Sequence, residues 1–324
     1  MSDLTLELIK LISQGKTVNE ISKKLQLSNR QIYNMLTLIK NKGFDFERKY
    51  YYNGDIIYVP KKKVNQVQNE GISIITEPSD KTFRAILISD LHMGSRYERL
   101  DLLNKIYDYC IKENIHIIIN GGDVIDGMIG NKNKKHDNII QQVDYAFRNY
   151  PFDKSILNFT VLGNHDIDSL HKVGQDFAEV LKNYRHDIVP LGYEEGQINI
   201  KNSKIFVQHP LFIEKVNRVP KKECLILKGH YHKMKLNTYS NKIVINIPSL
   251  SDIKFSDNEF LPGAIEMELK FNNGFITLGN FKHMLIDKKI HIINEIQLNF
   301  HYKTGDLQNL KIKNEEVREK VYTL

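Results

Sequence analysis

The sequence Ala85-Ile86-Leu87-Ile88-Ser89-Asp90-Leu91-His92 places two residues of metal-ligand type directly after a short apolar run. An apolar, β-branched run of this length predicts a buried strand. Asp90 and His92 are therefore expected where that strand ends and a loop begins, which is the usual place for a site in a layered α/β fold. The stretch thus predicts an α/β protein with polar chemistry at a strand end.

The same arrangement recurs at four later places in the chain. Apolar runs at 117–119, 159–162, 205–207 and 225–227 each precede residues of metal-ligand type. Where such strand ends meet, we expect two Asp, one Asn and four His to converge on metal. This set is Asp90, His92, Asp123, Asn164, His209, His230 and His232.

Five motifs in this order resemble the calcineurin-like metallophosphoesterase superfamily. The resemblance covers about residues 83–282 and implies a four-layer αββα sandwich that hydrolyses phosphoric esters. No ligand position of the family pattern is missing. The motifs are D-x-H at 90–92, G-D-x-x-D at 122–126, G-N-H-D at 163–166, a lone His209, and G-H-x-H at 229–232.

The expected cofactor is a pair of divalent metal ions. Two ions roughly 3.5–4 Å apart can hold both the attacking and the leaving oxygen of a phosphate displacement. A bridging carboxylate would screen their repulsion, and Asp123 is the candidate. Nitrogen and oxygen ligands without a thiolate favour Mn²⁺, with Fe or Zn²⁺ as alternatives. By resemblance, Asp90, His92 and His232 complete the first metal site, and Asn164, His209 and His230 the second.

His165 and Asp166 are the expected catalytic residues beside the metals. His165 is the candidate for protonating the leaving oxygen or for stabilising charge on the phosphate. Asp166 is expected to orient His165 through a hydrogen bond, and Asp126 is a further supporting candidate. His230 and His232 would face opposite ways on an extended segment, so we expect a turn at Gly229 to let both reach the metals.

The first sixty residues predict a small winged helix-turn-helix domain (1–60). Apolar spacing indicates helices over 4–14, 17–25 and 28–41, with a capping box from Thr17 to Glu20. Asn53-Gly54 lies between two β-prone runs, a strong signal for a hairpin. Three short helices and a hairpin resemble the winged helix-turn-helix class.

A basic outer surface makes this domain a candidate for binding DNA. Residues 1–63 hold twelve Lys/Arg against six Asp/Glu, a balance of +6 within a chain of net charge +7. We expect the third helix to enter a major groove and the hairpin to contact phosphates. The alternative is that the domain binds protein or packs on the catalytic domain. The predicted nucleic-acid contacts are Arg30, Tyr33, Asn34, Lys40, Arg48 and Lys49.

The rest of the chain divides into a linker (61–81), the phosphoesterase-like domain (82–282) and a C-terminal extension (283–324). The linker is expected to hold at most one strand, and the charged end of the extension is expected to be a surface helix. No apolar run approaches the ~20 residues of a membrane span. Without a signal-peptide pattern or a CxxC pair, a cytoplasmic location is the simplest.

These features favour a phosphodiesterase that acts on DNA, such as a nuclease. One alternative is a phosphatase or small-molecule phosphodiesterase whose N-terminal module is regulatory. A third is a DNA-binding regulator without catalysis, which the complete ligand set argues against. The expected partners are therefore DNA and a phosphoester substrate, with a protein partner at the N-terminal domain or the C-terminal tail as a further alternative.

Overall fold

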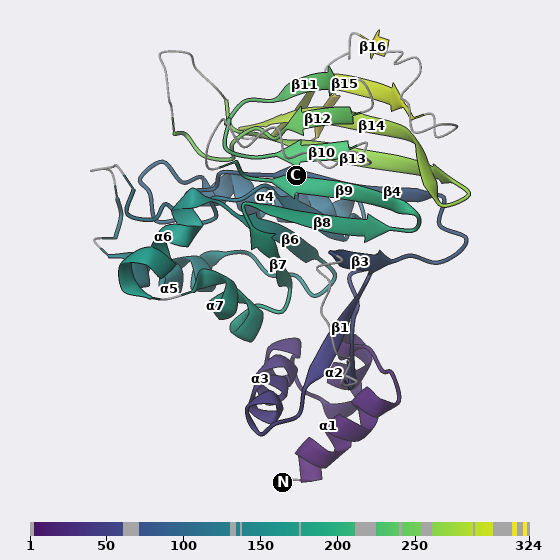
Figure 1. Ribbon diagram of the computed structural model, residues 1–324, viewed down its shortest axis with the longest axis vertical. Helices are drawn as coiled ribbons and strands as arrows, with labels where there is room; N and C mark the ends of the chain where they lie inside the picture. The colour runs from purple at the N-terminus through teal and green to yellow at the C-terminus, as the bar shows by residue number, and fades with distance from the viewer. Residues whose placement is uncertain are drawn as a thin grey trace.

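The N-terminal region of the computed structural model consists of three helices and a β-hairpin (Figure 1). Helix α1 spans Asp3–Ser13, α2 spans Val18–Leu25 and α3 spans Asn29–Asn41, as the sequence predicted. Capping boxes at Thr17 and Ser28 satisfy the first free N–H groups of α2 and α3. The predicted hairpin is confirmed as β1 (Phe46–Tyr51) and β2 (Ile56–Pro60). The described residues of the whole chain are 3–60, 71–129, 134–136, 138–174, 176–210, 225–239, 242–253, 261–287, 289–300, 313–315 and 320–322.

An eight-stranded sheet joins this hairpin to the rest of the protein. Its strand order is β11-β12-β10-β9-β8-β3-β1-β2. The predicted linker contains β3, which pairs in parallel with β1 on one side and β8 on the other. The N-terminal region is therefore continuous with the main sheet. The further strands are β3 (Ile72–Ile75), β8 (Glu195–Ile200), β9 (Ser203–Gln208), β10 (Leu225–Lys228), β11 (Lys235–Tyr239) and β12 (Lys242–Asn246).

A nine-stranded sheet lies behind the first in the view of Figure 1. Its order is β16-β15-β14-β13-β4-β5-β6-β7, with β17 also paired to β15. The strands β4, β5, β6 and β7 run parallel, so their carboxyl ends lie at one edge. The strands are β4 (Thr82–Ile88), β5 (Ile117–Asn120), β6 (Leu157–Leu162), β7 (Ile188–Tyr193), β13 (Gly263–Asn272), β14 (Phe275–Ile286), β15 (Ile290–Asn299), β16 (Lys313–Glu315) and β17 (Lys320–Tyr322).

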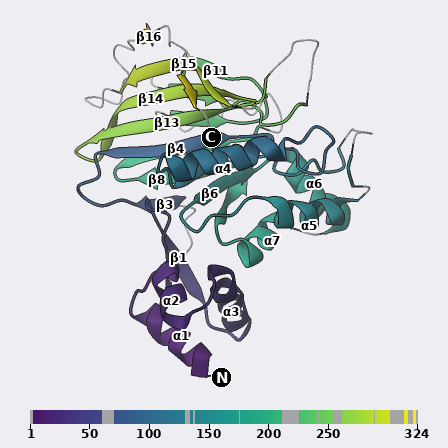
Figure 2. The ribbon, with the colours of Figure 1, turned by 180° about the vertical axis from the view of Figure 1, so that it is seen from behind.

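Two apolar cores hold these layers together. One core lies between the sheets, and the other lies between the nine-stranded sheet and its helices (Figure 2). A mixed α/β fold with two sheets is thus confirmed. The predicted fourth layer would need helices over the outer face of the eight-stranded sheet, and none of the described helices lies there. The helices on the nine-stranded sheet are α4 (Leu100–Lys112), α5 (Ile139–Asn149), α6 (Asn164–Val173) and α7 (Phe177–Tyr184).

The C-terminal extension continues the nine-stranded sheet, because β14 runs past residue 283 and β15 pairs with it. The surface helix was predicted for the charged end of the extension, most of which lies outside the described residues. β15 alternates buried and exposed residues over much of its length, which is the pattern of a strand with one face on the core. The described residues in the charged end of the extension form β16 and β17, which pair with β15 in the same sheet. None of the described helices is long and apolar enough to cross a membrane.

Candidate functional site

The predicted ligand residues follow neighbouring strands of the two sheets. β4, β5 and β6 are adjacent in one sheet, and β9 and β10 are adjacent in the other. The loops after β4 and β5 run side by side, because the Asp90 N–H donates to the Gly122 carbonyl at 2.9 Å. The Met93 N–H donates in the same way to the Val124 carbonyl, also at 2.9 Å. The sequence predicted this convergence from strand ends alone.

One group of ligand atoms comes from Asp90, His92 and His232. These atoms all lie within 4.8 Å of one another, and the residues are buried. The Nε2 atom of His232 is 3.1 Å from Asp90 Oδ1 and 3.4 Å from His92 Nε2. A carboxylate oxygen and two imidazole nitrogens at this spacing can hold one metal ion.

A second group comes from Asp123, His209 and His230. Its ligand atoms also lie within 4.8 Å of one another, with His209 Nε2 3.1 Å from Asp123 Oδ2. The buried Oδ1 atom of Asn164 has no hydrogen-bond partner among the described residues. A buried oxygen without a partner is costly, and a metal ion would satisfy it. The donor set therefore fits a divalent metal.

The backbone of the ligand loops is strained. Asp90, His92, Asp123, His230 and His232 all have positive φ, between 46° and 77°. A residue other than glycine in this region costs of order 1–3 kcal/mol, and such outliers cluster at functional sites. We expected a turn at Gly229 to direct both His230 and His232 to the metals. The structure instead achieves this by left-handed backbone at both histidines.

Two buried carboxylates give the centre its negative charge. Burial opposes ionisation of Asp90, but the nearby His232 outweighs it and lowers the pKa of Asp90 to about 2. Burial likewise opposes ionisation of Asp123, yet His209 holds the pKa of that carboxyl far below its ordinary value. In return, and against the effect of burial, Asp123 raises the pKa of His209 to about 10. Both carboxylates are therefore charged at neutral pH, where cations can bind.

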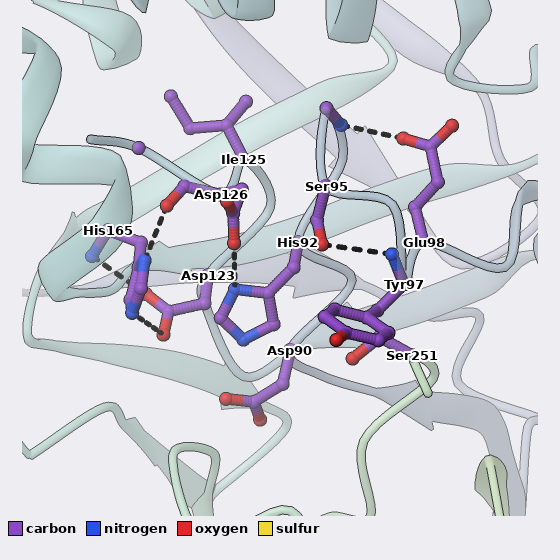
Figure 3. Close-up of polar contacts among 12 residues, drawn as sticks. Asp90, His92, Ser95, Tyr97, Glu98, Asp123, Ile125, Asp126, His165 and Ser251 are labelled. Carbon is purple, nitrogen blue, oxygen red and sulfur yellow. Dashed lines mark hydrogen bonds and ion pairs between the residues drawn. The ribbon is translucent and has the colours of Figure 1, made fainter. Parts of the chain in front are cut away.

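His165 lies beside Asp123 at the mouth of this centre (Figure 3). Its backbone N–H donates to Asp123 Oδ1 at 3.0 Å, and its Nε2 is 4.0 Å from Asp123 Oδ2. The other ring nitrogen, Nδ1, is 2.5 Å from the carbonyl oxygen of Asp126. That carbonyl can fix the ring if Nδ1 carries the proton, which leaves Nε2 toward the centre. His165 is placed where an acid–base residue could reach a bound phosphate.

Asp166 serves a different purpose from the one predicted. Its two carboxylate oxygens accept hydrogen bonds from the Ile125 and Gly163 N–H groups, each at 2.9 Å. Burial and the nearby Asp123 raise the pKa of Asp166 to about 7. Asp166 thus joins the second and third ligand loops, and the group that faces the His165 ring is the Asp126 carbonyl.

Asp126 is more central than its sequence position suggested. Its Oδ1 lies 3.3 Å from His92 Nδ1, and its Oδ2 is 3.3 Å from the Lys134 ammonium. A carboxylate behind a ligand histidine fixes the orientation and raises the basicity of the ring. Ser249, which no motif indicated, donates to the Asp90 carbonyl at 3.0 Å. Ser249 and Asp90 are 159 residues apart in the sequence, so no local motif indicates that they are in contact.

The family comparison agrees with this geometry. The calcineurin-like phosphoesterase family matches residues 83–273, more than half of the chain. The chain belongs to the calcineurin-like phosphoesterase family. The protein is accordingly a metal-dependent phosphoesterase, and residues 83–273 match the phosphoesterase domain.

Three solved structures similar to this chain are a phosphodiesterase, a Vps29 protein and a phosphoesterase. A novel archaeal phosphodiesterase is 15% identical, with a TM-score of 0.41, over 63% of this chain and 100% of that chain. Zn²⁺-bound Vps29 from Entamoeba histolytica is 14% identical, with a TM-score of 0.41, over 68% of this chain and 100% of that chain. YfcE, a phosphoesterase from E. coli, is 15% identical, with a TM-score of 0.39, over 60% of this chain and 96% of that chain. Similarities at this level carry no information on substrate. No curated protein matches the chain.

The predicted nucleic-acid face of α3 is partly engaged by the phosphoesterase domain. Tyr33, expected to point outward, is only 7% exposed and stacks on His186 with ring centroids 4.5 Å apart. Arg48 donates from Nη2 to the Lys182 carbonyl at 2.7 Å, which ties the hairpin to α7. The outward prediction is wrong for Tyr33, because its ring packs between the domains.

The other predicted contacts on this face differ in their surroundings. Arg30 is exposed, and its guanidinium lies 5.9 Å from the centre of the Phe147 ring. Asn34, Lys40 and Lys49 are exposed. These exposed residues remain candidates for contact with a phosphate backbone.

Proposed function

We propose that the protein is a dinuclear metal-dependent phosphodiesterase that acts on DNA. The observation that carries this proposal is the pair of ligand groups on one edge of the two sheets, with His165 beside Asp123. In this proposal the two groups hold one divalent ion each, and Asp123 lies between them. Asn164 would complete the second site through its unsatisfied Oδ1.

Two bound divalent ions would acidify a water molecule and offset the charge of the phosphate. The protein's own residues supply the rest. Asp126 holds the His92 ring from behind, at 3.3 Å. His165, fixed at Nδ1, presents Nε2 to the leaving oxygen; with both ring nitrogens protonated, it gives the Nε2 proton to that oxygen and keeps the Nδ1 proton on the Asp126 carbonyl. Mn²⁺ is the proposed metal, with Fe or Zn²⁺ as alternatives for the same nitrogen and oxygen donors.

The N-terminal region supports a DNA substrate. We propose that α1–α3 and the β1–β2 hairpin form a winged helix-turn-helix over residues 1–60. Its local basic balance and its exposed Lys40 and Lys49 suit a phosphate backbone. Because β1 continues into the main sheet through β3, DNA held by this region would stay at a fixed distance from the metal centre. A cytoplasmic location is part of the proposal, and the buried free thiol of Cys110 suits a reducing compartment.

The test is hydrolysis by the purified full-length protein with and without Mn²⁺. Labelled single- and double-stranded DNA would be compared with an aryl phosphomonoester and an aryl phosphodiester, and Asp123→Ala would serve as the control. We expect Mn²⁺-dependent cleavage of DNA that Asp123→Ala abolishes. Turnover of the aryl esters without DNA cleavage would retain the phosphoesterase and refute the DNA substrate.

A second candidate is a phosphatase or small-molecule phosphodiesterase with a regulatory N-terminal domain. The observation that favours it is the burial of Tyr33 against His186. This contact covers part of α3, the helix that was expected to enter the major groove. Turnover of a monoester or cyclic nucleotide far above that of DNA would support this candidate. A regulator without catalysis is the third candidate, and sequence-specific DNA binding without any hydrolysis would support it.

A further inference from the structure

A large groove lies on the outer face of the eight-stranded sheet, where the N-terminal hairpin meets the phosphoesterase domain. Its volume is about 880 Å³, and residues of β1, β3, β8 and β9 line it. These strands lie next to one another across the junction of the two domains (Figure 1). The groove exists because β3 joins the two parts into a single sheet.

The lining of this groove is strongly basic. Lys49, Lys201 and Lys204 line it, and Glu47 is the one carboxylate among the described lining residues. Lys49 and Lys204 are exposed, and neither has an ion-pair partner in the described part of the chain. Lys201 donates to the carbonyl oxygen of Glu77 at 3.2 Å, which holds the side chain without neutralising its charge.

Uncharged polar groups form the floor between the lysines. Gln197 donates from Nε2 to Asn199 Oδ1 at 2.5 Å, and Asn199 donates from Nδ2 to Ser73 Oγ at 3.4 Å. This row runs from β8 to β3, so its geometry is fixed by the sheet. Positive charge over a row of amides and a hydroxyl suits an extended anion with many oxygen acceptors.

We infer that this groove binds the phosphate backbone of duplex DNA. The inference rests on the proposed function and names the surface that holds the substrate. Lys204 lies on β9, and the candidate ligand His209 directly follows this strand. An extended chain of five residues between them spans about 16 Å. That distance is about five steps of duplex at 3.4 Å per step, so the groove lies within the length of one short DNA segment from the metal centre. Contacts of this kind position the duplex without reading its sequence.

Fluorescence anisotropy with a labelled duplex of random sequence tests the inference. EDTA in the buffer prevents hydrolysis during the titration. The test variant is Lys49→Ala/Lys204→Ala, and Lys154→Ala/Lys289→Ala is a charge-matched control at exposed positions outside both the groove and the N-terminal region. The groove variant should bind about tenfold more weakly, and the slope of log K against log salt should shrink by about 1.8, or 0.9 for each lost contact. The control should bind like the wild type.

Equal binding by the groove variant and the wild type would overturn the inference, as would an equal loss in the control. Thermal unfolding midpoints would exclude misfolding, since neither lysine of the groove pair has an ion-pair partner among the described residues. A different result would refute the proposed function as well as the groove. If the wild-type protein neither binds nor cleaves DNA, DNA is not its substrate. If the wild type cleaves DNA and the groove variant binds normally, only the groove assignment is wrong.

Discussion

The ligand loops and the N-terminal helices use opposite kinds of local structure. In the helices, Thr17 and Ser28 form ordinary capping boxes, and each local preference agrees with the fold. In the loops, five candidate ligands adopt left-handed backbone that their residue types disfavour. Local sequence therefore explains the form of the N-terminal region, whereas only the surrounding protein explains the form of the metal centre.

The comparison also separates what each region contributes. The ligand loops adopt a strained backbone that brings charged and polar side chains together, as is common at functional sites. The helices contain little such strain, and α3 packs against the phosphoesterase domain through Tyr33. Changes in the loops should therefore affect activity more than stability, and changes at this buried helix contact should do the reverse.

The largest effect is expected for His165→Ala. We expect kcat on an aryl phosphodiester to fall by roughly 10²–10⁴, the usual contribution of a general acid or base. Metal content should stay the same, because His165 belongs to neither of the two groups proposed to hold the ions. A fall in metal content would instead assign a metal to His92, Asp126 and His165, whose ligand atoms also lie within 4.8 Å of one another. His171→Ala, an exposed histidine on the same helix, is the matched control and should keep full activity. Retention of near-full kcat by His165→Ala on a poor leaving group would contradict the acid role.

The next effect concerns the stability contributed by the contact between α3 and the phosphoesterase domain. Tyr33→Ala should lower the free energy of unfolding by about 3 kcal/mol, because a buried aromatic ring is lost from the contact with His186. Leu38→Ala on the same helix removes a side chain that is 61% exposed and should cost less than about 0.5 kcal/mol. Urea unfolding of both variants measures the difference. If the two variants lose the same amount, the interface contributes nothing.

A smaller effect is expected when the packing behind a ligand is disturbed. An added Cβ at Gly163 would lie 2.2 Å from Asp123 Oδ1 and would displace that carboxylate. Gly163→Ala should therefore weaken Mn²⁺ binding by about 10–100-fold, the usual effect of altering groups around a ligand. Calorimetric titration with Mn²⁺ measures it. In Gly43→Ala, the new Cβ meets nothing within 4 Å. Its φ of +92° strains an alanine, but Gly43 lies in the N-terminal region and contacts no candidate ligand, so metal affinity should not change.

The smallest effect, taken over a single pH unit, is a dependence of stability on pH at the domain interface. Burial, followed by the charge of Arg48, lowers the pKa of His186 to about 3, and Lys40 acts in the same direction. Tyr58 and Tyr33 also face the ring. His186 is thus neutral in the folded protein but protonates near its ordinary pKa of 6.5 when unfolded. Between these values the unfolded state binds more protons, so stability falls as the pH falls, by up to about 1.4 kcal/mol per pH unit.

His186→Gln isolates this contribution, since glutamine does not titrate. The difference in unfolding free energy between the wild type and His186→Gln should change as the pH is lowered from 6.5 toward 3. A difference that is constant over this range would mean that the histidine is not kept neutral by the interface.

Much of the metal centre could be predicted from the sequence, because its chemistry depends on residue types that follow recognisable strands. Asp90 and His92 follow β4, and His209 follows β9, so strand ends alone brought them together. The role of Asp166 could not be predicted in this way. Its partners are the backbone N–H groups of Ile125 and Gly163, and no side-chain pattern reports where backbone groups point.

The helix and hairpin boundaries of the N-terminal region were also predictable, but its placement was not. Thr37 donates to the Asn183 carbonyl across 146 residues of sequence. An amphipathic helix shows which face is apolar, but a polar face with an aromatic residue looks the same whether it meets solvent, DNA or another domain. In the C-terminal extension, apolar and polar residues alternate over 290–299, and this alternation was the sequence signal for strand β15.

Strand β3 also has a consequence for the order of events during synthesis. Its partner on β8 pairs Ile72 with Ile198, so this part of the sheet waits until that distant segment has left the ribosome. The capped helices need only local contacts and can fold earlier. A nascent chain that extends only to α5 would then expose the edge of β3 that later pairs with β8. That edge is where a chaperone, or a second nascent chain, would bind before β8 is made.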